Sequence, residues 1–251
     1  MTTQAYMKLF YNGSHPLQER AKEYFTRHIS FSAEATQHAL SELEANELVK
    51  LSLGALVALD SLKEYERVLE STLGVHISAI EASEICYQAT PYVGFARVSA
   101  FVERSFELFE ARGVAVPSQA RTDSKTREQR GLEAQRAIFG EAIDRGNATA
   151  PSDEKHIRSY LSSNCFGDYY TREGLTLRFR ELLTFVFLSA LGGAQPQLIA
   201  HASGNLRLGN TRAKLIAAVT ALIPLMGYPR ALNALSAIDE VSQAGKGVAD
   251  K

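Results

Sequence analysis

The sequence predicts an all-α protein made of two tandem helical repeats that pack into one compact unit. Apolar residues recur at helical spacing along most of the 251-residue chain, and no segment shows the alternating pattern of a β-strand. Matching segments of the two halves share one sequence offset, and turn-rich segments separate the halves.

The first half begins with a helix at Pro16, because proline favours the first helical position. The apolar residues of this helix share one face: Leu17, Ala21, Tyr24 and Phe25. A second helical region runs from about residue 32 to residue 59, and we expect a break near Asn46. Ser78 followed by Glu81 is a capping box, which opens a helix through Ile85.

Two linker-like segments, 113–124 and 146–153, flank a charged helical stretch at 127–145. In the second half, the apolar run 182–191 predicts a buried helix, and Thr211 is the N-cap of a later one. The sequence therefore divides into three parts. Residues 1–112 are an N-terminal repeat with leading helices, residues 113–153 are a linker with a charged helix, and residues 154–251 are a C-terminal repeat.

The repeat rests on one constant separation. Pro91 and Pro224 lie 133 positions apart (224 − 91 = 133), as do Gly94 and Gly227, and Arg97 and Arg230. The same separation aligns two further pairs: Ser78 with Thr211, and Leu73 with Leu206. A cap, a Pro-x-x-Gly break and the apolar helices thus fall in register, which indicates a duplication. We expect both glycines to end helices.

Composition excludes several classes of protein. The formal net charge of −1 provides no general attraction to nucleic acid or anionic membranes, so neither is expected as a partner. The longest apolar run is about half the length that spans a bilayer. The N-terminus lacks a signal-peptide pattern, and the two cysteines, Cys86 and Cys165, form no CxxC pair, so a reduced cytoplasmic protein is expected.

The second half carries an ordered series of short motifs. They are residues 166–172 (FGDYYTR), 180–184 (RELLT), 190–193 (ALGG), 197–201 (QLIAH), 204–211 (GNLRLGNT) and 227–234 (GYPRALNA). In this order and spacing they resemble the carboxymuconolactone decarboxylase-like superfamily, which includes the alkylhydroperoxidase-D-like proteins. The resemblance is dense from about residue 165 to 239 and weaker, but in register, from about 47 to 104.

The resemblance implies an all-helical homo-oligomer. Single-domain members often form hexameric rings, which would make this chain a trimer. The activities it implies are decarboxylation of a carboxylated muconolactone and, in the sister branch, reduction of peroxides by a CxxC pair followed by a histidine.

The peroxide reaction needs one thiolate to attack and a second to resolve the sulfenic acid. Relative to His201, the two cysteine positions of that branch are occupied by Ala194 and Gln197. The matching positions of the first half are occupied by Ser61 and Glu64, and the histidine position by Val68. Because no thiol stands at any of them, two-cysteine peroxidase chemistry is disfavoured at this site.

The remaining residues suggest acid–base catalysis. We expect His201 and Glu181 to be catalytic, with the imidazole as proton donor or oxyanion partner and the carboxylate orienting it. Arg180 is a candidate for binding a substrate carboxylate through its guanidinium fork, and Tyr170 and Arg172 are candidates for the same pocket. The same residues also fit a structural role, as an ion pair at a helix start and a satisfied, partly buried histidine.

The first half keeps only part of the pattern. It lacks the histidine, at Val68, but it offers Glu81 and Glu84, and it retains Tyr92 where the second half has Leu225. Either a composite site forms between repeats or subunits, or the first half is a scaffold.

The function expected is cofactor-free lyase or isomerase chemistry on a small organic acid or lactone. The alternatives are a non-catalytic oligomeric binding or scaffold protein and, disfavoured, a peroxidase. No cofactor is expected, because the chain has no P-loop. No metal is expected either, because the six histidines are scattered and form no i, i+4 pair.

Overall fold

A computed structural model describes residues 1–249, and within them it contains helices and no β-strand, as the all-α prediction requires. The first part contains α1 (Thr3–Tyr11), α2 (Leu17–Arg20), α3 (Lys22–Ala39), α4 (Ala45–Ala58), α5 (Leu62–Thr72), α6 (Ala79–Val93) and α7 (Phe95–Ala111). The middle contains α8 (Arg127–Phe139), α9 (Ala142–Ala148), α10 (Lys155–Tyr160) and the π-helix η1 (Leu161–Tyr170). The last part contains α11 (Leu177–Leu191), α12 (Gln195–Arg207), α13 (Arg212–Met226) and α14 (Tyr228–Ala249).

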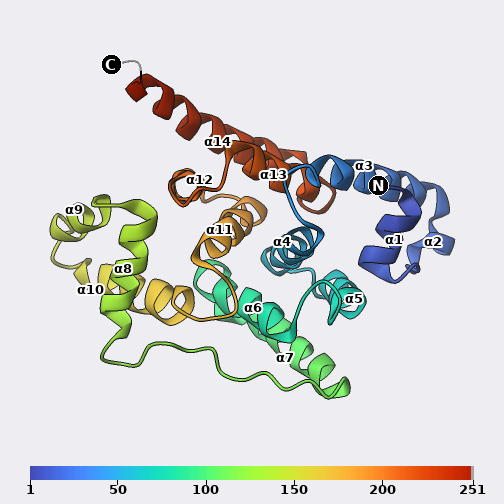
Figure 1. The fold of residues 1–251 in the computed structure, drawn as a ribbon, viewed down its shortest axis with the longest axis horizontal. Coiled ribbons are helices and arrows are strands. Elements are labelled where there is room, and N and C mark those ends of the chain that lie inside the picture. Colours follow the sequence, from blue (N-terminus) through green and yellow to red (C-terminus); the bar gives the residue numbers. More distant parts are fainter. Residues whose placement is uncertain (250–251) are drawn as a thin grey trace.

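The helices form a central bundle with a cover on each side (Figure 1). Helix α11 packs against α4, α6 and α12, and α13 packs against α3, α4 and α14. The leading helices α1–α3 cover one side of this bundle, where α1 contacts α5. Helix α8 and η1 pack on each other at the opposite side, and α8 also contacts α12.

Helix α11 is the centre of the core. Every residue from Phe179 to Ala190 is buried, which confirms the buried helix expected over the apolar run. Burial of one large apolar side chain contributes about 1.5–3 kcal/mol, so this helix is a main source of stability. Helix α4 approaches it closely at Gly54, where a Cβ atom would lie 2.5 Å from Leu183 Cδ1.

The expected boundaries of α6 and α13 are present. The hydroxyl of Ser78 accepts a hydrogen bond from the backbone N–H of Glu81, whose carboxylate accepts one from Ser78. The hydroxyl of Thr211 accepts a hydrogen bond from the backbone N–H of Lys214 at the start of α13. Gly94 (φ 86°) and Gly227 (φ 79°) end α6 and α13 in a conformation that favours glycine. The first and last residues of α13 lie 133 positions after those of α6 (212 − 79 = 133).

The helical region 32–59 is interrupted at residues 40–44, close to the expected position, because the Glu44 carboxylate caps the start of α4. Three features differ from the expectations. The helix expected from Pro16 to Phe25 is interrupted at Ala21 (φ −139°), so α2 and α3 are separate, and Leu17 and Tyr24 are exposed. The charged stretch 127–145 breaks at Gly140, whose φ of 67° ends α8. The π-helix had no sequence signal that we recognised. Among the described residues, no helix has the length and apolarity needed to cross a bilayer.

Candidate functional site

The structure brings His201 and Glu181 into direct contact between α11 and α12. The His201 Nδ1 atom lies 2.6 Å from Glu181 Oε1. The Glu181 side chain is fully buried, and that of His201 is 9% exposed. The Asn205 amide donates to the main-chain carbonyls of both residues, at 2.9 Å to Glu181 and 2.8 Å to His201. The two helices are therefore joined at the level of this pair.

Gly204 leaves the space that the carboxylate occupies. A Cβ atom at this position would lie 2.6 Å from Glu181 Oε1 and 2.6 Å from Ile138 Cγ2, closer than real Cβ contacts. Glycine is unfavourable inside a helix, by roughly 1 kcal/mol relative to alanine. The Gly-Asn pair after His201 thus contributes space for Glu181 and a hydrogen bond to its main chain.

A chain of hydroxyl groups continues from the carboxylate. The Tyr170 hydroxyl donates to Glu181 Oε2 (3.2 Å) and lies 2.5 Å from Thr184 Oγ1 and 2.9 Å from the Tyr92 hydroxyl. A carboxylate only accepts hydrogen bonds, so the Tyr170 hydroxyl donates its proton to Glu181. The hydroxyls of Tyr92 and Thr184 can then donate to Tyr170, and the Cys165 thiol donates to Tyr92. Burial raises the pKa of both phenols well above their usual range, so they remain neutral donors.

The π-helix positions Tyr170 and is held against α8 by two glycines. A Cβ atom on Gly131 would lie 1.8 Å from the Ser162 carbonyl oxygen, and one on Gly167 would lie 2.2 Å from the Arg127 carbonyl oxygen. The two backbones therefore touch, which no larger residue allows. An Arg127–Asp168 ion pair adds a second link between them.

Aromatic rings surround the imidazole. The rings of Phe139 and Tyr92 meet that of His201 edge-on, with centroids 5.2 Å and 5.8 Å away. Among the described residues, His201 Nε2 has no hydrogen-bond partner, whereas Nδ1 faces Glu181. The nitrogen turned away from the carboxylate, Nε2, is thus the one that could exchange a proton with a ligand.

The two arginines of the site do not face His201. The Arg180 guanidinium is fully buried and donates to Glu84 Oε2 (2.9 Å), Gln88 Oε1 (3.0 Å) and the carbonyls of Arg172 and Glu173. Arg172 pairs with the same Glu84 carboxylate at 2.9 Å and 3.1 Å. Burial lowers the pKa of Arg180, opposed by Glu84. This geometry gives both arginines a role in joining α6 to the second half.

Both thiols are buried and protonated. Burial raises the pKa of Cys86 to about 11 and that of Cys165 to about 12. A thiol is a weak nucleophile until it ionises, so neither is activated in the manner of a peroxidatic cysteine.

Sequence reasoning named His201, Glu181 and Tyr170 as candidates, and in the structure Glu181 contacts both the His201 imidazole and the Tyr170 hydroxyl. It did not identify Thr184, which lies three residues after Glu181 on α11, or Gln88 and the cover from α8, which reach the site through tertiary packing. Gly204 did stand in the motif after His201, and its mid-helix position was a signal that could have been used.

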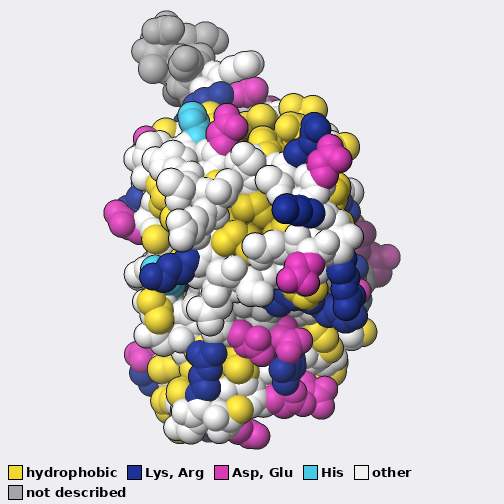
Figure 2. All heavy atoms as spheres, turned by 90° about the vertical axis from the view of Figure 1, so that its right-hand side faces the viewer, with side chains coloured by type: hydrophobic (Ala, Val, Ile, Leu, Met, Phe, Trp, Pro, Cys, Tyr) yellow, Lys and Arg dark blue, Asp and Glu magenta, His cyan; other side chains and the backbone are white. Residues whose placement is uncertain are grey.

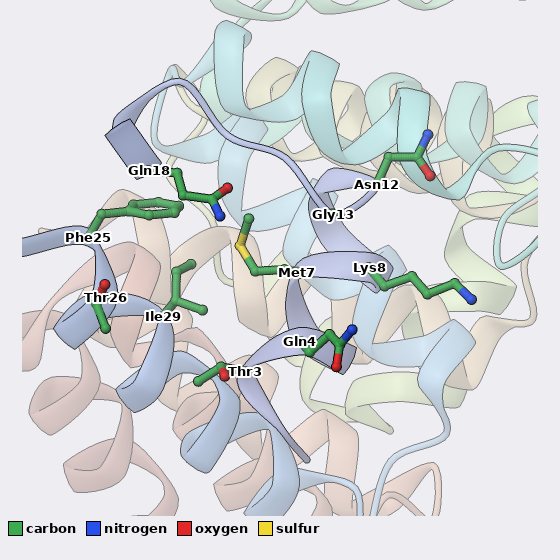
Figure 3. Close-up of a pocket in the computed structure, with 10 residues that line it drawn as sticks. All are labelled: Thr3, Gln4, Met7, Lys8, Asn12, Gly13, Gln18, Phe25, Thr26 and Ile29. Atoms are coloured by element: carbon green, nitrogen blue, oxygen red, sulfur yellow. The ribbon is translucent and has the colours of Figure 1, made fainter. Parts of the chain in front are cut away.

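The cavities described lie elsewhere, around the leading helices. Figure 3 shows a groove of about 550 Å³ between α1 and α3, where Met7, Phe25 and Ile29 form the apolar floor and Lys8 stands at the rim. On the face seen in Figure 2, the described Lys and Arg side chains are interspersed with Asp and Glu, in keeping with the near-zero net charge.

Comparison with known families gives one match. The carboxymuconolactone decarboxylase family matches residues 157–240, a range that contains η1, α11, α12 and α13 in full. No curated protein matches the chain. The matched region contains Tyr170, Glu181 and His201, whereas Tyr92 and Phe139 come from outside it.

Proposed function

We propose, from the match of residues 157–240 to the carboxymuconolactone decarboxylase family, that the protein catalyses cofactor-free acid–base chemistry on a small organic acid or lactone. The reaction class is decarboxylation or isomerisation. The observation that carries the proposal is the buried Glu181–His201 contact, continued by the Tyr170 hydroxyl.

In this mechanism Glu181 sets the tautomer of His201. Its carboxylate accepts the Nδ1 proton, so the neutral ring has its lone pair on Nε2. Decarboxylation breaks the bond to the substrate carboxylate, releases CO₂ and leaves the electron pair delocalised onto the lactone carbonyl. Before this step His201 Nε2 takes up a proton from solvent, and the imidazolium then delivers that proton from Nε2 to the carbon, which returns the ring to its neutral form. General acid catalysis of this kind typically contributes 10²–10⁴-fold.

Tyr170 and Arg180 act as positioning residues in this proposal. The Tyr170 hydroxyl is saturated by Glu181, Thr184 and Tyr92, and its side chain is almost fully buried, so it holds the carboxylate instead of contacting substrate. Arg180 holds α11 against α6 through Glu84. We expect Arg172, 17% exposed and paired with Glu84, to be the arginine nearest to solvent in this group.

The site is composite, in our proposal, because α6 of the first half contributes Tyr92, Gln88 and Glu84 to the surroundings of residues from the second. Helix α13 begins and ends 133 positions after α6, which supports the duplication that the sequence predicts. We further propose that the chain forms a homotrimer in place of the family's six-domain ring. Light scattering tests this: a mass three times that of the chain is expected, and a monomer contradicts it.

The test of catalysis compares turnover of a set of carboxylated γ-lactones by the wild type, His201→Asn and His76→Asn. His76 lies between α5 and α6, with its ring near Asn46, and serves as the matched control. We expect His201→Asn to lose at least about 100-fold in kcat while His76→Asn keeps the wild-type rate. The proposal is contradicted if His201→Asn keeps full activity on a lactone that the wild type turns over.

A non-catalytic binding or scaffold role is the second candidate, favoured by the aromatic cover over His201 and by the missing histidine at Val68. The two differ in ligand response. A working pocket predicts a higher Tm with the same lactones, reduced in His201→Asn. A non-catalytic binding protein predicts a higher Tm without turnover, and a scaffold predicts neither turnover nor a change in Tm.

A further inference from the structure

A second polar pair lies in a cavity of the first half, far along the chain from the proposed site. The cavity has a volume of about 370 Å³, in the range of small-molecule sites. Its walls come from the leading helices, the α4–α5 region and the end of α13. The apolar and aromatic part of the lining consists of Tyr11, Leu17, Tyr24, Phe25, Leu56, Leu59, Pro224 and Leu225.

Glu64 and His15 form a polar pair in this cavity, which His28 and Ser61 also line. The His15 Nε2 atom lies 3.4 Å from Glu64 Oε1, and the Arg67 guanidinium lies 2.5 Å from the same oxygen. The His15 side chain is only 5% exposed, whereas that of Glu64 is 31% exposed. The backbone N–H of Leu17 donates to His15 Nδ1 at 3.1 Å, so the ring proton is on Nε2 and points to the carboxylate.

Aromatic packing fixes this imidazole. The His15 ring stacks on Phe25, with centroids 4.6 Å apart and planes inclined by 16°, and meets Tyr11 edge-on at 5.0 Å. Burial raises the pKa of Tyr11 above its usual range and lowers that of His28, which also lines the cavity. Both groups are therefore neutral at pH 7, and Glu64 is the charged acceptor that faces the space.

These features define the ligand. A carboxylate only accepts hydrogen bonds, so the ligand must offer a donor. Arg67 already compensates the charge of Glu64, which favours a neutral hydroxyl over an ammonium group. Apart from His28 and Ser61, the remaining lining is apolar and aromatic, which suits a planar ring. We propose that this cavity binds a small hydroxylated aromatic compound, with Glu64 accepting its hydroxyl and His15 holding the carboxylate.

This site is separate from the proposed catalytic one. At the positions that match Glu181 and His201, the first half has Leu48 and Val68, which line a small void that Glu64 also borders. Its polar pair is assembled one helical turn earlier, from Glu64 of α5 and from the α1–α2 connection. The test of this inference therefore does not depend on whether His201 catalyses a reaction.

The test is an NMR titration of the ¹⁵N-labelled full chain with phenol, with toluene as the probe that lacks the hydroxyl. We expect phenol to shift the amides of Leu17, Leu59 and Ser61. Glu64→Met keeps the length of the side chain and removes the acceptor. It should weaken phenol binding about tenfold or more, because a hydrogen bond to a charged acceptor is lost, and it should leave toluene binding unchanged.

Glu66→Met is the matched control. Glu66 lies on the same helix, is 33% exposed and also pairs with an arginine, Arg104, but it does not line the cavity. Ser61→Phe should fill the cavity and remove the binding of both probes, and it covers the case in which Glu64→Met unfolds. The inference is overturned if millimolar phenol leaves these amides unshifted, if Glu64→Met binds phenol as the wild type does, or if Ser61→Phe leaves binding intact.

Discussion

Replacing Arg180 by methionine tests the ion pair that joins the two halves. Methionine has a similar length and keeps the apolar part of the contact, but it removes the guanidinium. The change leaves the buried Glu84 carboxylate with Arg172 as its remaining cation, and it leaves Gln88 Oε1 without its donor. The main-chain carbonyls of Arg172 and Glu173 lose a donor as well.

The expected loss follows from these contacts. Breaking a buried ion pair by removing one partner costs about 3–5 kcal/mol. Arg172 still donates to Glu84 at 2.9 Å and 3.1 Å, and within the described residues Arg180 Nε is buried without a partner, so the wild-type pair is not ideal. Both facts place the loss near the lower end, about 3 kcal/mol. The double variant Arg180→Met/Glu84→Met leaves fewer buried charges, so it should lose less than the sum of the single variants.

Urea unfolding followed by far-UV circular dichroism measures this. With an m value of about 3 kcal/mol/M, a loss of about 3 kcal/mol lowers the midpoint by about 1 M. Arg212→Met is the control, because Arg212 pairs with Asp239 at the surface, with side chains 45% and 51% exposed, and should cost less than about 1 kcal/mol. If Arg180→Met costs no more than the control, or if the two single losses simply add, the reasoning about this buried pair is refuted.

Three further predictions concern the packing around the site. In Gly204→Ala the new Cβ atom would lie 2.6 Å from Glu181 and Ile138, so one of these side chains must move. The variant should be less stable by about 1–3 kcal/mol, although alanine has the better helix propensity. A higher Tm in thermal unfolding would contradict this. Gly131→Ala should separate α8 from η1 and speed amide hydrogen exchange in both helices. Gly146→Ala is the control and should not change the exchange rates, because nothing lies within 4 Å of its Cβ position. Equal exchange rates in the two variants would argue against the close approach of α8 and η1. Because burial raises the pKa of Cys86 from 9.0 to about 11, the folded thiol keeps a proton that the unfolded chain releases, so stability should fall by about 1.4 kcal/mol per pH unit for this group as pH rises from about 9 to 11. Urea midpoints over that range should fall less steeply in Cys86→Ala, and an unchanged slope would refute the assignment.

Much of the frame was predictable because its signals are local. The capping box at Ser78, the helix-ending Gly94 and Gly227, and the apolar run of α11 each act through neighbours in the sequence, and each is present in the structure. The break of the charged helix at Gly140 was missed, although its positive φ is a conformation that glycine favours.

The site was predictable in part. His201 and Glu181 were named as acid–base partners, and they lie on adjacent helices at matching levels. The direction of Arg180 was not predictable: Glu181 faces α12 whereas Arg180 faces α6, and its partner Glu84 is 96 positions away. The same holds for His15 and Glu64, which are 49 positions apart and meet only because α1–α3 fold back over α5.

The central claim is that Glu181 and His201 act together as an acid–base pair on a lactone. The most direct measurement is deuterium exchange from D₂O into the carbon next to the carbonyl of a lactone that lacks the departing carboxylate, followed by ¹H NMR. Wild-type protein should catalyse this exchange, and His201→Asn should reduce it to the background rate. Exchange at the wild-type rate in His201→Asn would contradict the account.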